Sequence, residues 1–223
     1  MKFTKTLTAA AIIAAGFALN AQAADKMKIA MVVKTLGNGF FDAAHQGADE
    51  AAKELGNVEI IFTGPAKATA EGQIELINSL VAQKVDAIVV SANDPDALVP
   101  ATKKAMGRGI KVLSFDSGIA KDGRLFNLLP SSNALIGEKL VKMTVDAVGN
   151  KGEIAVLSAT AQATNQNAWI EEMKKVLAKP EYKDLKLVTV AYGDDQTDKS
   201  YREEQGLFKS YPNLKAIIAP TTV

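Results

Sequence analysis

Two charged side chains stand directly after apolar segments of this chain. Lys34 follows the apolar run 28–33, and Asp116 follows the run 110–115. Charged side chains are seldom buried unless they are paired, so a charged residue at the end of a buried strand is expected to bind a partner or a ligand. The carboxyl ends of parallel strands meet at one edge of a sheet, and ligands of such sheets bind in the crevice there. We therefore expect Lys34 and Asp116 to belong to one binding site.

Polar and aromatic side chains also follow the other apolar runs. Carboxylates, amides and hydroxyls can satisfy several hydroxyl groups at once, and an aromatic ring can cover an apolar C–H face. These residue types favour a neutral polyol as the ligand. Asn165 could instead cap a helix, and one of Phe40 and Phe41 could pack in the core. The candidates given by position are Lys34, Asn38, Phe40, Phe41, Asn93, Asp116, Asn165, Gln166, Thr221 and Thr222.

Several neighbouring residues fit a structural role at least as well as a role in binding. Asp94 is equally suited to cap the helix that follows it. Asp194 and Asp195 fit a solvated turn at a helix start better than a binding site. His45 and Trp169 are single residues on expected helices, where packing is the more common role. These five residues are therefore left outside the candidate site.

The composition argues against most catalytic chemistry. The 223 residues include no Cys and one His, so thiolate catalysis, disulfides, iron–sulfur clusters and His-rich metal centres are not expected. The segment 37–42 begins like a dinucleotide fingerprint, but Asp42 stands where the third glycine is needed. The chain has no P-loop and no GxSxG motif. We expect a binding protein with no catalytic residues, cofactor or metal; an exported enzyme is the remote alternative.

The N-terminus has the three-part pattern of a secretory signal. A basic start with Lys2 and Lys5 is followed by the apolar stretch 7–19 and by small residues up to Ala23. We expect a signal peptide over 1–23, cleaved after Ala23, and a mature protein in the periplasm; a buried N-terminal helix is the alternative. The remaining chain has 24 basic and 25 acidic residues, which gives no electrostatic attraction for nucleic acid.

Beyond this segment, apolar runs of strand length alternate with segments of helical periodicity. Continuous Val/Ile/Leu runs separated by helices predict an α/β protein with parallel sheets covered on both faces. The expected strands are 28–33, 58–62, 85–91, 110–115, 125–129, 153–158, 187–192 and 216–219. The expected helices are 42–55, 73–83, 96–106, 133–148, 166–178 and 199–210.

One connection breaks the alternation and suggests two lobes. Residues 116–124 leave no room for a helix between two strands, and the stretch 128–132 leads into a new series of units. We expect one doubly wound lobe over 24–129 and a second over 130–223. About 90 residues is short for this architecture, so we also expect the second lobe to be incomplete and the sequence to be truncated at its C-terminus.

The motifs of the whole mature chain resemble one family. The run 28–33 is followed by GNGFF at 37–41 and GADEAA at 47–52, and then by SANDP at 91–95 and SFDS at 114–117. These motifs resemble the type I periplasmic sugar-binding proteins of the ribose-binding/LacI-like superfamily. The motifs LSAT at 157–160, TNQNAW at 164–169 and IAPTT at 218–222 are similar to the rhamnose-binding branch, which is close to the autoinducer-2-binding proteins.

The resemblance implies two lobes joined by hinge crossovers that close around one sugar. It implies an ABC importer whose membrane permease receives the sugar; we expect a monomer, with a chemoreceptor as a further partner if the ligand is autoinducer-2. Asn165 stands where Asp is expected in autoinducer-2 binders, which favours L-rhamnose and leaves autoinducer-2 as the alternative. By this similarity, the positions that contact autoinducer-2 are Lys34, Asp116, Asn165, Gln166 and Pro220, and those that contact pentoses are Asn38, Phe40, Phe41 and Asn93.

Overall fold

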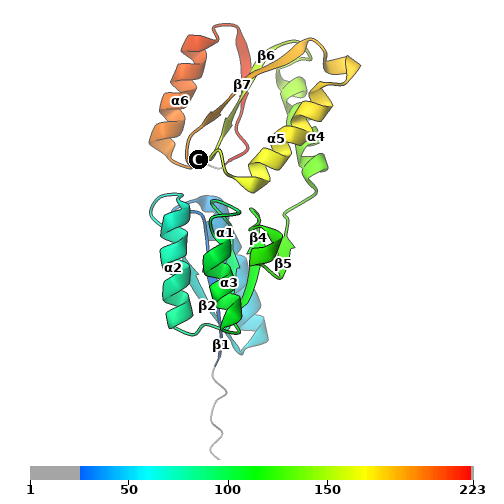
Figure 1. Cartoon of the computed structure of the whole chain (residues 1–223). Coiled ribbons are helices and arrows are strands. Elements are labelled where there is room, and N and C mark those ends of the chain that lie inside the picture. Colours follow the sequence, from blue (N-terminus) through cyan, green and yellow to red (C-terminus); the bar gives the residue numbers. More distant parts are fainter. Residues whose placement is uncertain (1–25, 222–223) are drawn as a thin grey trace, which may run out of the picture.

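The computed structural model describes residues 26–221, which form two α/β lobes stacked end to end (Figure 1). The expected signal peptide and Thr222 lie outside the described residues. The chain passes from the first lobe to the second through residues 129–132. No helix in the described part of the chain is long and apolar enough to cross a membrane.

The first lobe is a five-stranded parallel sheet in the order β2-β1-β3-β4-β5. Short apolar runs form its strands because both faces of the sheet are covered by helices. Its elements are β1 (Met27–Val32), α1 (Gly39–Leu55), β2 (Val58–Thr63), α2 (Ala70–Ala82), β3 (Ala87–Val90), α3 (Val99–Gly107), β4 (Lys111–Phe115), the 3₁₀ helix η1 (Lys121–Gly123) and β5 (Phe126–Leu128).

The second lobe is a three-stranded parallel sheet in the order β7-β6-β8. Helices α4 and α5 lie together on one side of it, and α6 lies on the other side (Figure 1). Its elements are α4 (Asn133–Val148), β6 (Gly152–Ser158), α5 (Thr164–Leu177), the 3₁₀ helix η2 (Pro180–Tyr182), β7 (Leu185–Tyr192), α6 (Thr197–Ser210) and β8 (Leu214–Ile218).

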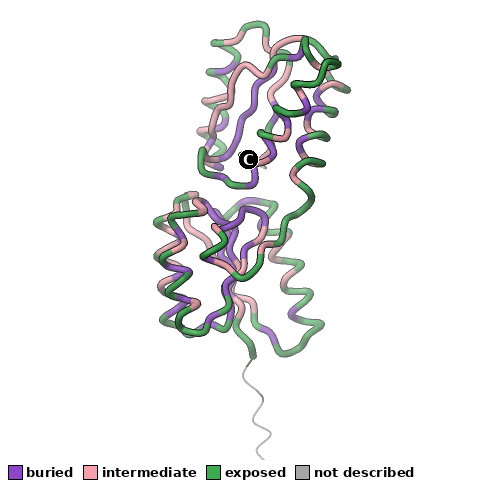
Figure 2. The backbone as a smooth tube through the Cα atoms, turned by 45° about the vertical axis from the view of Figure 1, so that its right-hand side comes forward, coloured by how far each residue is buried: buried purple, intermediate pink, exposed green. Residues whose placement is uncertain are grey.

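Each lobe has its own apolar core between its sheet and its helices. In the first lobe, Val32, Ile88 and Val112 of the sheet pack with residues of α2 and α3 and have no exposed surface. In the second lobe, Ile154 and Met173 belong to the corresponding core under α4 and α5. Figure 2 shows the buried residues concentrated along the strands of both lobes. The first lobe has a further apolar cluster on the α1 side of its sheet, formed around Met31, Val33 and Phe41. Because the two lobes share no core, each can act as a rigid unit on either side of the connection.

Helix caps explain where the observed helix starts differ from the expected ones. Helix α1 begins at Gly39 instead of residue 42 because the Asn38 side chain accepts a hydrogen bond from the Phe40 N–H. Helix α3 begins at Val99 instead of residue 96, because Asp94 accepts from the N–H groups of Asp96 and Ala97 and holds a turn there. The segment 116–124 does contain a helix, the single 3₁₀ turn η1, which a period-3.6 pattern does not reveal.

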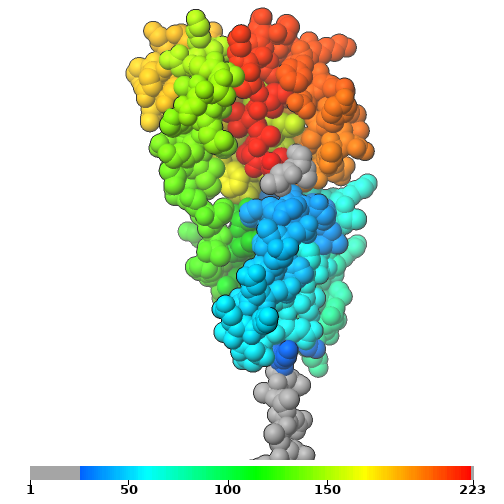
Figure 3. All heavy atoms as spheres, turned by 180° about the vertical axis from the view of Figure 1, so that it is seen from behind, coloured from blue at the N-terminus to red at the C-terminus, as the bar shows by residue number. Residues whose placement is uncertain are grey.

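The carboxyl ends of strands from both sheets point toward the junction between the lobes. The segments that follow β1, β4, β6, β7 and β8 all lie at this junction (Figure 1). From behind, the atoms of the two lobes meet at the junction, where part of α5 is visible in yellow (Figure 3). The topology therefore brings the polar residues after the strands together.

Candidate ligand site between the lobes

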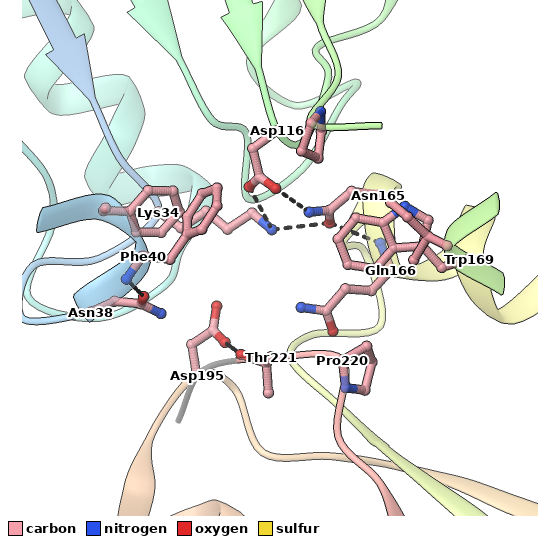
Figure 4. A pocket seen from close by; sticks show the side chains of 13 residues that line it. Lys34, Asn38, Phe40, Asp116, Asn165, Gln166, Trp169, Asp195, Pro220 and Thr221 are labelled. Atoms are coloured by element: carbon pink, nitrogen blue, oxygen red, sulfur yellow. Dashed lines mark hydrogen bonds and ion pairs between the residues drawn. The ribbon is translucent and has the colours of Figure 1, made fainter. Parts of the chain in front are cut away.

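A cavity of about 240 Å³ lies between the lobes, and both lobes contribute to its wall (Figure 4). Its polar side chains come from the segments after the strands and from the first turn of α5, and its apolar side chains come mainly from α1, α4 and α5. The lining residues are Lys34, Asn38, Phe40, Phe41, Asp116, Pro130, Ile136, Asn165, Gln166, Trp169, Asp195, Pro220 and Thr221.

Three buried side chains form a polar network across the junction. The Asn165 amide nitrogen donates to Asp116 Oδ1 at 2.6 Å, and the Asn165 oxygen accepts from Lys34 Nζ at 3.2 Å. Lys34 Nζ also lies 3.8 Å from Asp116 Oδ2. Lys34 and Asp116 belong to the first lobe and Asn165 to the second, so this network joins the lobes directly (Figure 4).

Asp116 is held in place by its backbone and by a neighbouring strand end. Its φ angle is +56°, in the left-handed region that Asp tolerates better than most residues. Its N–H donates to the Leu128 carbonyl oxygen at 2.9 Å, and Ser91 Oγ donates to Asp116 Oδ2 at 2.8 Å. The carboxylate is therefore fixed before a ligand binds, and binding costs less conformational entropy as a result.

The Lys34 ammonium lies in an environment that disfavours its charge. Burial lowers the pKa of Lys34 below the ordinary 10.5 of lysine, and the negative charges of Asp116 and Asp195 oppose this shift. The side chain is 4% exposed. A buried cation with these two carboxylates nearby can donate strong, charge-assisted hydrogen bonds to ligand oxygens.

The second lobe supplies both a donor and an acceptor. Gln166 Oε1 accepts from Ser158 Oγ at 2.6 Å and from the Ala159 N–H at 2.7 Å, so its amide nitrogen is turned toward the cavity (Figure 4). Asp195 Oδ1 accepts from Thr221 Oγ1 at 2.6 Å, which leaves the other carboxylate oxygen for a ligand. This side of the cavity can therefore both donate hydrogen bonds to ligand hydroxyl groups and accept hydrogen bonds from them.

Aromatic side chains form the apolar part of the wall. Phe40 and Phe41 pack edge to face with ring centroids 5.3 Å apart, and Phe41 also packs against Phe115 in the core. Phe41 is 3% exposed and Phe40 is 39% exposed. Phe40 is therefore the ring that presents a free surface, while Phe41 anchors α1 to the sheet.

Nine of the candidate residues line this cavity, and Asn93 and Thr222 do not. Asn93 lies behind the cavity, where its amide nitrogen holds two backbone carbonyl groups. Its nitrogen donates to the carbonyl oxygens of Lys34 at 2.9 Å and Thr69 at 3.2 Å, and it is 4% exposed. Asn93 thus positions Lys34 from outside the cavity. Thr222 lies outside the described residues.

The cavity also contains residues that were not among the candidates. Pro130, Ile136, Trp169 and Asp195 all line it. Asp195, which the sequence favours as part of a solvated turn, is instead 8% exposed and lines the cavity, where its carboxylate accepts a hydrogen bond from Thr221. Its neighbour Asp194 faces outward and pairs with Lys199. In the sequence, Asp195 is indicated by its position after a strand, but Asp194 has the same position, so the pattern does not single out Asp195.

His45 and Asp94 have the structural roles that competed with binding. His45 stacks on Phe62 with ring centroids 4.1 Å apart, and Asp94 caps a turn. Trp169 combines a packing role with a place in the cavity wall: it is 9% exposed, and its Nε1 donates to Asn133 Oδ1 at 3.1 Å. Within residues 26–221, no group of three or more His, Cys, Asp and Glu residues could hold a metal ion.

Comparison with known proteins agrees with this arrangement. The periplasmic binding protein domain matches residues 29–223. The chain belongs to this family. The resemblance drawn from the motifs and the expected fold class, a type I periplasmic binding protein with two doubly wound lobes, are both confirmed.

Similar proteins of this family bind sugars and related small molecules. A solute-binding protein from Clostridium phytofermentas, solved with bound L-rhamnose, has 38% sequence identity and a TM-score of 0.86; the match covers 89% of this chain and 61% of that chain. The D-ribose/D-allose-binding protein of Pseudomonas aeruginosa is 28% identical over 91% of this chain and 65% of its own length. LsrB from Clostridium saccharobutylicum, solved with AI-2, shares the fold with a TM-score of 0.81 and 24% identity; the match covers 86% of this chain and 61% of that chain.

The chain spans less than two thirds of the length of these three relatives. The relative with bound L-rhamnose is the solute-binding protein of an ABC transporter.

Proposed function

We propose that this protein is the periplasmic solute receptor of an ABC importer and that it binds a monosaccharide, L-rhamnose, between its lobes. The observation that carries the proposal is the buried network of Lys34, Asp116 and Asn165 at the wall of a small cavity shared by both lobes. The residues of this network are fixed in place, and none of them is arranged as a nucleophile with a general base. The site is therefore suited to holding a ligand without changing it.

The size and lining of the cavity support a sugar as the ligand. About 240 Å³ is below the roughly 300–1,000 Å³ of pockets for drug-sized molecules, which favours a ligand as small as one sugar ring. Lys34 and Gln166 provide donors, and Asp116 and Asp195 provide acceptors, which suits a ring of hydroxyl groups. Phe40 provides an aromatic surface for the C–H face of the ring.

Closure of the lobes follows from where these groups lie. A sugar that bonds Lys34 and Asp116 on one lobe and Gln166 and Asp195 on the other makes all its contacts only when the lobes are closed. The ligand thereby shifts the population toward the closed form, because it binds that form more tightly. We propose that a membrane permease, and a chemoreceptor where one is present, recognise the closed form of the monomer.

L-Rhamnose is favoured over AI-2 by one residue of the network. The amide of Asn165 donates to Asp116 at 2.6 Å, and a carboxylate in its place would put two acceptors against each other. The relative with bound L-rhamnose is 38% identical to this chain. AI-2 is the second candidate, because Lys34, Asp116 and Gln166, which correspond to AI-2-contacting positions by the resemblance, all line the cavity.

Calorimetric titration against L-rhamnose and AI-2 in parallel tests this assignment. We expect L-rhamnose to bind with a micromolar or lower Kd and AI-2 to give no heat above dilution. Binding of AI-2 alone would assign the protein to uptake of that signal and overturn the choice of rhamnose. Conversion of a bound sugar, detected as a new mass after incubation, would overturn the binding-protein assignment.

A further inference from the structure

We propose that Pro130, Ile136 and Trp169 form an apolar subsite that receives the methyl group of a 6-deoxy sugar and discriminates against a hydroxymethyl group. The inference rests on the proposed sugar-binding function and assigns selectivity to residues outside the polar network. Pro130 lies in the connection between the lobes, Ile136 in the first turns of α4, and Trp169 on α5.

The three residues form one corner of the cavity. Trp169 Nε1 donates to the side chain of Asn133, the first residue of α4, at 3.1 Å. Ile136 is three residues further along α4, so it lies on the same face of that helix as Asn133. Pro130 precedes this turn. The corner is distinct from the aromatic surface of Phe40 and Phe41, which belongs to α1 of the other lobe.

This corner offers no hydrogen-bonding side-chain group to a ligand. The side chains of Pro130 and Ile136 carry no polar atom, and the one donor of Trp169 is already bonded to Asn133. A hydroxyl group placed here would lose its water without gaining a partner from these three side chains. A methyl group in the same place has no hydrogen bonds to water to lose, and it buries apolar surface.

The polar neighbours of the corner are directed elsewhere. Both ends of the Asn165 amide are occupied, by Asp116 on one side and by Lys34 and the Gln166 N–H on the other. The Gln166 oxygen is bonded to Ser158 and to the Ala159 N–H, and the amide nitrogen points to the part of the cavity where Asp195 and Thr221 lie (Figure 4). The hydroxyl-binding groups and the apolar corner therefore face different parts of one ligand, as a deoxy sugar requires.

Three sugars that differ only at this position provide the test. L-Lyxose, L-rhamnose and L-mannose share the configuration of the ring hydroxyls and carry hydrogen, methyl and hydroxymethyl, respectively, at C5. We expect L-lyxose to bind about fourfold more weakly than L-rhamnose, because one buried methyl group is missing. We expect L-mannose to bind about 5- to 150-fold more weakly than L-rhamnose, because its additional hydroxyl is buried without a partner.

The variant Ile136→Ala links this selectivity to the corner. It should weaken L-rhamnose binding by at least threefold and leave L-lyxose binding within twofold, and Ile136→Asn should move the preference toward L-mannose. Leu135→Ala is the matched control, because Leu135 is the preceding residue of α4, is 45% exposed and does not line the cavity. Ratios between sugars measured on one preparation are independent of the fraction of the variant that is folded.

The possible outcomes separate this inference from the proposed function. Strong binding of L-rhamnose with the expected order of the other two sugars, altered by Ile136→Ala and unaltered by Leu135→Ala, supports the subsite. Equal binding of all three sugars, or equal losses for L-rhamnose and L-lyxose in Ile136→Ala, overturns the subsite and leaves sugar binding intact. Absence of binding by all three overturns both.

Discussion

Replacing Asp116 with alanine is expected to raise the Kd for L-rhamnose by about 30- to 1,000-fold, equivalent to roughly 2–4 kcal/mol. The carboxylate is 6% exposed and holds Asn165 at 2.6 Å and Lys34 at 3.8 Å. Its removal leaves the Lys34 cation buried without its nearest countercharge and deprives sugar hydroxyls of an acceptor. Calorimetric titration of the purified variant measures the effect.

A second aspartate provides the control for this variant. Asp122 is exposed, with 77% of its side chain accessible, and pairs with Lys103 on the surface of the first lobe. Asp122→Ala is expected to leave the Kd for L-rhamnose within twofold of wild type, because exposed ion pairs contribute little. Near-wild-type affinity in Asp116→Ala would contradict the assignment of this cavity as the sugar site.

Replacing Lys34 with methionine is expected to raise the Kd for L-rhamnose by about 10- to 100-fold, since hydrogen bonds from a charged donor contribute about 1.5–3 kcal/mol. Methionine keeps much of the length of the side chain and removes its charge. It leaves Asp116 and Asp195 facing the cavity without the cation between them. Lys53→Met, an exposed replacement near the end of α1, is the matched control and should have no effect on binding.

The pH dependence of binding distinguishes a charged Lys34 from a packing role. Because burial lowers the pKa of Lys34, the affinity of the wild type should fall as the pH rises through a value below 10.5, and this loss should be missing in Lys34→Met. The free energy of unfolding has the opposite dependence. The unfolded chain holds the Lys34 proton more firmly, so this residue's contribution to stability rises with pH between its lowered pKa and 10.5. Identical pH profiles of binding for wild type and Lys34→Met would contradict the role of the charge.

The sequence predicted the fold and nine of the thirteen residues that line the cavity. Parallel strands place their carboxyl ends at one edge, so a charge directly after a buried strand has few other places to lie. Lys34 and Asp116 satisfied this rule, and they lie at the centre of the network. Asn165 was recognised by its position after β6, although its bond to Asp116 across the lobes could not be read from the sequence.

Other parts of the site depend on geometry that residue types do not reveal. Asn93 has the right type and position, but its side chain bonds to the backbone behind the cavity. Asp194 and Asp195 are adjacent, chemically identical and alike in their left-handed φ angles, yet Asp194 pairs with Lys199 and Asp195 bonds to Thr221 in the cavity wall. Ile136 and Trp169 lie on helices, where an apolar residue normally indicates core packing. Their place in the cavity wall follows from the packing of α4 against α5.

One measurement tests most directly the claim that a sugar binds between the lobes. Trp169 is the only tryptophan of the chain and lines the cavity, so its fluorescence reports events at this site alone. We expect a saturable change of Trp169 emission on titration with L-rhamnose, with the same Kd as that obtained by calorimetry, and a matching rise of the Kd from both signals in Asp116→Ala. Calorimetric binding of L-rhamnose with unchanged Trp169 emission would contradict this claim, because the sugar would then occupy another part of the protein.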